Sequence, residues 1–292
     1  MELTRQPKKI PVYLHIPKNA GTYLIHVFTN YFIRLVASAS ELAVQRLTVC
    51  GDNFNLTLFV KFNSDYWKTD ENIKEHHFSA ARARKCVFST LKTYIDNNQL
   101  YVLAIVIEPE DGELRPSFGK VDQILNLCES KGAYFSIFRE VFSRQQSLYH
   151  YITGDESSHE PSHQSIKEAS FVEYLSSDSL EDSWLIRSIT GMKDDWAITG
   201  FWFNQCFNFL DNFNFLIKDI KNTDNIINEV LFSCFKEGLS SSDTNTTMRN
   251  STKIENKIII NDLDEAVKEK FLKRTFWDRK IREKYCKNVD IS

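Results

Sequence analysis

The stretch Val12-Tyr-Leu-His-Ile-Pro-Lys-Asn-Ala-Gly-Thr-Tyr-Leu24 decides how this 292-residue chain begins to fold. Residues 12–16 form a short apolar run that contains one histidine, and this pattern predicts a buried strand. Residues 17–22 predict a turn. From residue 23 to about residue 37, apolar residues recur at helical spacing. The chain is therefore expected to open with a strand, a tight loop and a helix.

A loop of this kind is suited to binding an anion. The first N–H groups of a helix lack partners, and the helix dipole also favours negative charge there. Gly21 would let the backbone come close to phosphate oxygens, and it is the only glycine between residues 1 and 50 of a chain that has 9. The residues expected to contact the anion are Lys18, Asn19, Ala20, Gly21, Thr22 and Tyr23.

The rest of the chain alternates strands and helices and then becomes mostly helical. We predict strands over residues 56–62, 100–107 and 134–138, and helices over residues 80–97, 118–129 and 142–152. Beyond residue 165 the expected helices cover residues 171–175, 184–189, 198–217, 226–235 and 263–285. This order favours an α/β fold with a mainly parallel sheet flanked by helices. No linker is visible, so residues 1–292 are expected to form a single domain.

Composition excludes several classes of protein. The 36 Lys and Arg against 39 Asp and Glu give a net charge of −3, which provides no electrostatic footprint for nucleic acid. The 22 Phe and 11 Tyr argue against intrinsic disorder. The 6 Cys are widely spaced, which favours reduced thiols over a zinc site or disulfides. With no signal peptide and no apolar run long enough to span a bilayer, we expect a soluble, cytoplasmic protein without a transmembrane segment.

A second motif lies at Tyr134-Phe-Ser-Ile-Phe-Arg-Glu-Val-Phe-Ser-Arg-Gln-Gln-Ser-Leu-Tyr149. It places Arg139 at the end of a predicted strand, where ligands of α/β proteins bind. The guanidinium fork of arginine can hold phosphate with two hydrogen bonds. Ser147 lies on the helix that follows and can donate a hydroxyl. Arg144 on that helix is as well explained as a solvated or salt-bridged residue.

The first motif is not a Walker A loop, because Lys18 precedes Gly21 instead of following the last glycine. Together, His15-Ile-Pro-Lys-Asn-Ala-Gly-Thr22 and the second motif resemble sulfotransferases that use 3′-phosphoadenosine 5′-phosphosulfate (PAPS). The likeness is to the carbohydrate branch, which contains the heparan sulfate 2-O- and 6-O-sulfotransferases. Glu140 and Val141 depart from the Asp-Pro that is usual in that family.

The resemblance implies a P-loop NTPase-like three-layer sandwich and transfer of the sulfuryl group of PAPS to a hydroxyl of a carbohydrate or glycoconjugate. It places the first loop on the 5′-phosphosulfate, and Arg139 and Ser147 on the 3′-phosphate. It requires no metal. Lys18 would stabilise the charge that develops on the leaving phosphate.

Three further segments resemble the family more weakly. Residues 248–253 are similar to a basic, Thr-containing loop that closes over the nucleotide, so Arg249 and Thr252 are expected to touch the donor; a flexible polar loop explains them equally well. Residues 184–191 resemble a mid-chain segment that ends in Arg-x-Leu-x-Gly. Residues 276–279 are similar to a C-terminal helix that carries an Asp.

A base must accept the proton of the acceptor hydroxyl, and histidine suits neutral pH. In the family, this base is usually a histidine at the end of a mid-chain strand, which favours His77, with His76 next to it. Glu75 and Glu108 are the alternatives. Two other functions stay open: a P-loop kinase, which would need Mg²⁺, and a non-catalytic nucleotide-binding module.

Overall fold

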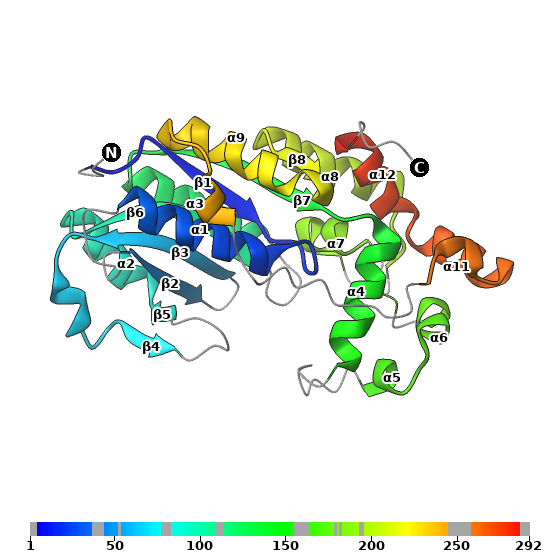
Figure 1. Cartoon of the computed structure of the whole chain (residues 1–292). Coiled ribbons are helices and arrows are strands. Elements are labelled where there is room, and N and C mark those ends of the chain that lie inside the picture. Colours follow the sequence, from blue (N-terminus) through cyan, green and yellow to red (C-terminus); the bar gives the residue numbers. More distant parts are fainter. Residues whose placement is uncertain are drawn as a thin grey trace.

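The computed structural model describes residues 5–36, 44–51, 54–76, 83–108, 114–154, 164–177, 180, 183–192, 196–244 and 258–286. Within these residues lies an eight-stranded sheet (Figure 1). The strands are β1 (Lys9–Leu14), β2 (Val44–Gly51), β3 (Phe54–Phe62), β4 (Lys74–His76), β5 (Ala83–Cys86), β6 (Leu100–Glu108), β7 (Lys131–Phe138) and β8 (Leu216–Asp219).

The helices in this part of the chain include the two that follow the motifs, α1 (Gly21–Leu35) and α4 (Val141–Thr153). The others are α2 (Phe88–Asp96), α3 (Arg115–Leu127), α5 (Gln164–Lys167), α6 (Phe171–Ser176), α7 (Trp184–Thr190), α8 (Gly200–Asn212), α9 (Thr223–Phe235), α10 (Ser241–Thr244), α11 (Glu265–Arg274) and α12 (Phe276–Tyr285). Short 3-10 helices lie at Asp65–Lys68, Ile220–Asn222 and Ile260–Asp262. None of the described helices has the length and apolar character needed to cross a membrane.

The strand order is β4-β5-β2-β3-β6-β1-β7-β8. The half that contains the first strand, β6-β1-β7-β8, is parallel throughout, as predicted. In the other half, β2 and β5 are parallel, whereas β3 runs antiparallel to both β2 and β6, and β4 antiparallel to β5. Parallel strands put their carboxyl ends at one edge, so the loops after β1, β6 and β7 lie together there.

Helices cover both faces of the sheet, which gives the predicted three layers. On one face, α1 and α9 pack on residues such as Tyr13, Val106 and Phe135. On the other face, helices that include α3, α7, α8 and α12 pack on residues such as Val12 and Ile105. Because β6 is covered on both sides, its sequence is apolar at almost every position, as expected for a buried strand.

A third apolar cluster gathers residues of α4, α6 and α11, among them Phe142, Tyr174 and Phe271. Figure 1 shows α4 extending away from the carboxyl end of β7, with α6 and α11 beside it. This helical lobe therefore lies beside the carboxyl edge of the parallel strands, where α4 contacts the loop after β1.

Several predicted boundaries were wrong. The sequence predicts one helix over residues 80–97, but β5 precedes α2 in the structure. A helix over residues 198–217 ends instead at Asn212, and β8 follows after a turn in which Asn214 has a φ of 49°. The predicted helix over residues 263–285 is two helices that meet at Thr275. Strand β2 was not predicted.

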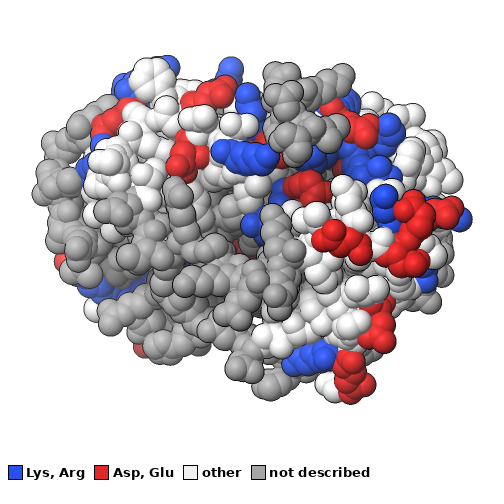
Figure 2. Space-filling model, turned by 45° about the vertical axis from the view of Figure 1, so that its right-hand side comes forward, with Lys and Arg blue, Asp and Glu red and all other residues white. Residues whose placement is uncertain are grey.

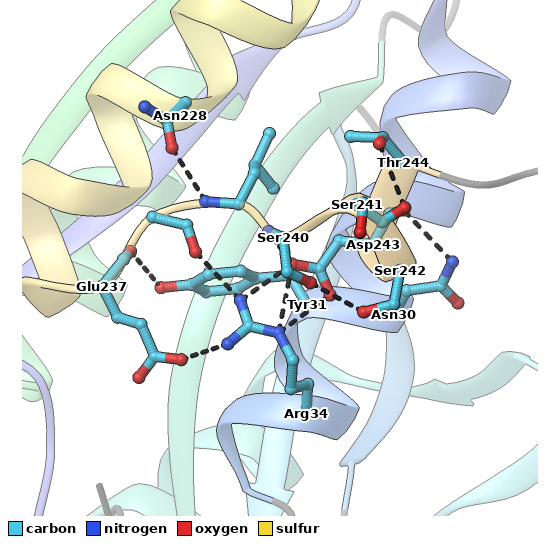
Figure 3. A network of polar contacts seen from close by, with 12 residues as sticks. Asn30, Tyr31, Arg34, Asn228, Glu237, Ser240, Ser241, Ser242, Asp243 and Thr244 are labelled. Atoms are coloured by element: carbon cyan, nitrogen blue, oxygen red, sulfur yellow. Dashed lines mark hydrogen bonds and ion pairs between the residues drawn. The ribbon is translucent and has the colours of Figure 1, made fainter.

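A charged network ties the last turn of α1 to the segment after α9 (Figure 3). The Arg34 guanidinium donates from Nε and Nη2 to the Asp243 carboxylate, at 3.0 and 2.8 Å, and also to Glu237 and to the carbonyl oxygen of Gly238. Asp243 also accepts the backbone N–H of Ser240 at 2.8 Å. Because Asp243 is only 1% exposed, this buried carboxylate depends on Arg34 for its charge balance.

Candidate functional site

The loop between β1 and α1 has the backbone form of an anion cradle. Lys18 and Ala20 both have a φ of 63°, a left-handed conformation that costs a residue with a side chain about 1–2 kcal/mol. Ala20 is the N-cap of α1 and offers no side-chain cap. A left-handed residue followed by the helical Gly21 turns successive N–H groups toward one point, which is the arrangement known as a nest. The strain and the uncapped helix end both favour a bound anion.

Asn19 anchors this loop to the sheet. Its Nδ2 donates to the carbonyl oxygen of Ile137 in β7 at 3.0 Å, and its own carbonyl oxygen accepts the Tyr13 hydroxyl at 3.0 Å. The side chain is 1% exposed. Asn19 therefore fixes the loop to the sheet. Its backbone is engaged as well, because its N–H donates to the carbonyl oxygen of Ile16 at 3.1 Å.

Gly21 is required for a steric reason that the sequence does not reveal. A Cβ on Gly21 would lie 2.0 Å from Nε2 of His15. The His15 ring also stacks on Tyr13, with ring centroids 5.9 Å apart, so it is held at the start of α1. Burial and the nearby charge of Lys18 lower the pKa of His15 to about 4, so the ring is neutral at pH 7.

Two cations face this site without a carboxylate to balance them. Lys18 and Arg139 are partly buried, and neither forms an ion pair within the described residues. Burial and the positive charge of Arg139 lower the pKa of Lys18, and burial lowers that of Arg139. Placing like charges near each other where water is partly excluded is unfavourable unless an anion joins them.

The carboxylates that neighbour Arg139 are bound elsewhere. Glu140 caps α4 by accepting the backbone N–H groups of Phe142 and Ser143 at 2.9 and 2.8 Å. Asp219 pairs in register with Phe138, next to Arg139, but its carboxylate accepts from Arg282 at 2.6 Å. Glu140, which stands where the family has Asp, thus caps α4, and within the described residues Arg139 forms no ion pair.

One face of α4 lies next to the loop after β1. Arg144, Ser147 and Tyr151 are three and four residues apart, so they share that face. Arg144 is buried, and its Nε donates to the carbonyl oxygen of Pro17 at 3.2 Å. It is therefore not a solvated surface residue: it holds the loop after β1 against α4. Ser147 on the same face is also buried.

Glu108 comes from the strand next to β1. The N–H of His15 donates to the carbonyl oxygen of Ile107 at 3.1 Å, so Glu108 lies beside the start of the loop after β1. Its Oε1 accepts the Thr57 hydroxyl at 3.0 Å. Its negative charge also opposes the lowering of the pKa of Arg46 that burial causes. Glu108 is the alternative base that the structure brings to this edge.

The predicted base His76 does not share this position. His76 is the last residue of β4, five strands from β1 in the sheet order, which is about 24 Å at typical strand spacing. It pairs with Ala83, the first residue of β5, and so does not end at the carboxyl edge of the parallel strands. His77, Arg249 and Thr252 lie outside the described residues.

The remaining predicted contacts differ in how much they offer a ligand. Thr22 is exposed on the first turn of α1. The Tyr23 hydroxyl instead donates to Asp224 of α9 at 2.7 Å.

Gly191 has a φ of 68° and ends α7, while Asp278 accepts the N–H of Ser183 at 2.8 Å before α7 begins. Thus the two weaker family-like segments that the structure describes stabilise α7.

A cavity of about 630 Å³ lies elsewhere, at the amino ends of β1 and β7, where Lys9, Lys131 and Tyr134 line it. The left-handed loop, Lys18 and Arg139 lie at the opposite edge of the sheet. Within the described residues, no cluster of His, Cys, Asp and Glu could hold a metal ion. Figure 2 shows positive and negative side chains interspersed on the face that it presents.

Comparison with known proteins does not place the chain in a family. No protein-family model, no curated protein and no solved structure matches it. The function must therefore be argued from the geometry of the loop, the two cations and Glu108.

Proposed function

We propose that this chain is a sulfotransferase that moves the sulfuryl group of PAPS to a hydroxyl of a carbohydrate or glycoconjugate. We also propose that its sheet and phosphate loop belong to the P-loop NTPase-like class of α/β folds. Support comes from the His15–Thr22 loop, whose strained backbone and uncapped helix end suit a phosphosulfate. The acceptor class rests on the sequence resemblance.

The observation that carries the proposal is the pair Lys18 and Arg139. Each is a partly buried cation that forms no ion pair within the described part of the chain, and Arg139 lies close enough for its charge to lower the pKa of Lys18. An anionic ligand held between them would satisfy both. PAPS offers such groups in its 5′-phosphosulfate and its 3′-phosphate, and the assignment of Lys18 to the first and Arg139 to the second rests on the sequence resemblance. Ser147 would add a hydroxyl to the 3′-phosphate.

In the proposed reaction, the acceptor oxygen attacks sulfur as the bond from sulfur to the bridging phosphate oxygen breaks. The products are a sulfate ester and adenosine 3′,5′-bisphosphate, and the hydroxyl proton passes to a base. Lys18 and the N–H groups of α1 stabilise the charge on the departing phosphate. Glu108, the last residue of the strand next to β1, is our first candidate for that base, although its Oε1 accepts the Thr57 hydroxyl of β3, and His77 stays the other candidate.

Binding tests the donor site. We expect adenosine 3′,5′-bisphosphate to raise the melting temperature, because a ligand that binds only the folded state stabilises it. Lys18→Ala and Arg139→Ala should each weaken this ligand about 10- to 150-fold, the equivalent of a lost charged hydrogen bond. Lys131→Ala, an exposed lysine at the opposite edge of the sheet, is the matched control. Stabilisation by ATP–Mg²⁺ alone would favour a kinase and reject the proposal.

Turnover tests the chemistry. Radiolabelled sulfate on PAPS can be followed into a panel of glycans and simple alcohols, with Glu108→Gln, His77→Ala and His76→Ala compared in parallel. We expect Glu108→Gln to reduce kcat at least 100-fold with little change in donor affinity. If only His77→Ala does so, histidine is the base. Donor binding without transfer to any acceptor would favour the non-catalytic module.

A further inference from the structure

Lys18, in the loop after β1, contacts an aromatic ring of α4. Its Nζ lies 4.1 Å from the centroid of the Tyr151 ring, within the range of a cation–π contact. Lys18 belongs to the loop after β1, whereas Tyr151 lies at the end of α4, and the ring is 46% exposed. The contact therefore joins the loop after β1 to α4 at the proposed donor site.

This ring is a weak partner for an ammonium group. Lys18 has no carboxylate in the described part of the chain, and the neighbouring charge of Arg139 is repulsive. The face of a tyrosine ring offers only a partial negative charge. A phosphate oxygen offers a full charge and a charge-assisted hydrogen bond, which is stronger. An anion on the α1 N–H groups would thus compete with Tyr151 for the same ammonium.

We propose that Tyr151 holds Lys18 in the free protein, gives it up to the bound phosphosulfate, and takes it back when the product leaves. The inference rests on the proposed function, since it takes the anion to be that of PAPS or its product. Because the ring competes with the ligand, it weakens nucleotide binding. The same competition speeds release of adenosine 3′,5′-bisphosphate, a step that limits turnover in many enzymes.

The test compares Tyr151→Leu, which removes the ring, with Tyr151→Phe, which keeps it. Calorimetry with adenosine 3′,5′-bisphosphate should show about 2- to 30-fold tighter binding to the Leu variant, the range that typical cation–π contacts correspond to. Stopped-flow release should slow by a similar factor. The Phe variant should bind within about twofold of the wild type. Unchanged or weaker binding to the Leu variant would overturn the proposal.

A spectroscopic measurement reports the exchange directly. Protons on the Lys18 ε-carbon, identified by their loss in Lys18→Met, should resonate upfield while they lie over the ring. They should move downfield when ligand is added, and a signal that does not move contradicts the exchange. If the wild type does not bind the nucleotide, the proposed function fails, and the same variants are then titrated with inorganic pyrophosphate. Tighter binding of pyrophosphate to Tyr151→Leu still supports the exchange, whereas no binding overturns it.

Discussion

The imidazole of His15 occupies the space beside the α-carbon of Gly21, where an added Cβ would lie 2.0 Å from Nε2. The His15 ring has little room to move away, because it stacks on Tyr13 and the backbone N–H of His15 is bonded to the carbonyl oxygen of Ile107. We expect Gly21→Ala to lower the free energy of unfolding by about 1–3 kcal/mol, the usual cost of overpacking. Urea denaturation measures this value.

Two variants separate this clash from a general effect of alanine. Gly119 lies within α3 and has nothing within 4 Å of the place of its Cβ, so Gly119→Ala should be neutral or stabilise by up to about 1 kcal/mol. In a His15→Ala background, Gly21→Ala should cost much less than it does alone. Equal costs in both backgrounds would show that the ring is not the obstacle.

His15 also makes stability depend on pH. Its pKa is about 4 in the folded state and about 6.5 in the unfolded chain, so between these values only the unfolded chain binds the proton. The contribution of the neutral His15 ring to the free energy of unfolding is therefore complete above pH 6.5 and is lost as pH falls toward 4. The loss amounts to about 3 kcal/mol.

The measurement is the free energy of unfolding in urea between pH 7.5 and pH 4, compared with that of His15→Asn. The variant lacks the titrating ring and should lose less stability over this interval. Parallel curves for the two proteins would contradict the buried, neutral state of His15.

The contact between Arg34 and Asp243 predicts a second, separate acid effect. Although burial raises the pKa of Asp243, its hydrogen bonds with Arg34 and Ser240 outweigh burial, so the net pKa lies below its usual range. Its stabilising contribution is present above about pH 4 and is lost as pH falls through the lower folded-state value. Arg34→Ala should cost about 3–5 kcal/mol at pH 7, because it leaves a buried carboxylate without its partner.

Arg34→Lys is the matched variant for this network. It keeps the charge but cannot form the paired contacts from Nε and Nη2, so an intermediate loss is expected. In the Arg34→Ala protein, adding Asp243→Asn should recover part of the stability. A double variant less stable than Arg34→Ala would argue against an uncompensated charge.

Sequence patterns predicted the strands and helices that position the site but missed the strands β2 and β8. The apolar run that became β6 and the helical spacing that became α1 are strong local signals, and both elements are present. Strand β8 was missed because it follows α8 after a three-residue turn, and its four residues show no period of their own. Strand β2 depends on pairing with β3, which is distant from any motif.

The candidate site shows the same limit. The resemblance, together with two motifs at strand ends, predicted Lys18, Arg139 and Ser147 near one edge. The structure places β1, β7 and α4 next to one another there, and the binding roles of the three residues stay predictions. The role of Gly21 against His15 could not be predicted, since it depends on a ring that packs across the turn. Nor could the closeness of Glu108, because it follows from β6 inserting beside β1. Single-domain organisation stays a prediction.

Ala20 offers a test of the loop itself. Its left-handed φ of 63° is natural for glycine, so Ala20→Gly removes about 1–2 kcal/mol of strain but also loosens the unfolded chain by about 0.4–1 kcal/mol. The net expectation is a stabilisation of up to about 1 kcal/mol, with nucleotide affinity unchanged because the N–H groups stay in place. Ala20→Val should instead destabilise the protein and weaken adenosine 3′,5′-bisphosphate, since a β-branched residue resists this conformation. Thermal unfolding and calorimetry on the two variants measure both effects. If valine left both quantities unchanged, the left-handed turn at Ala20 would not be what shapes the anion site.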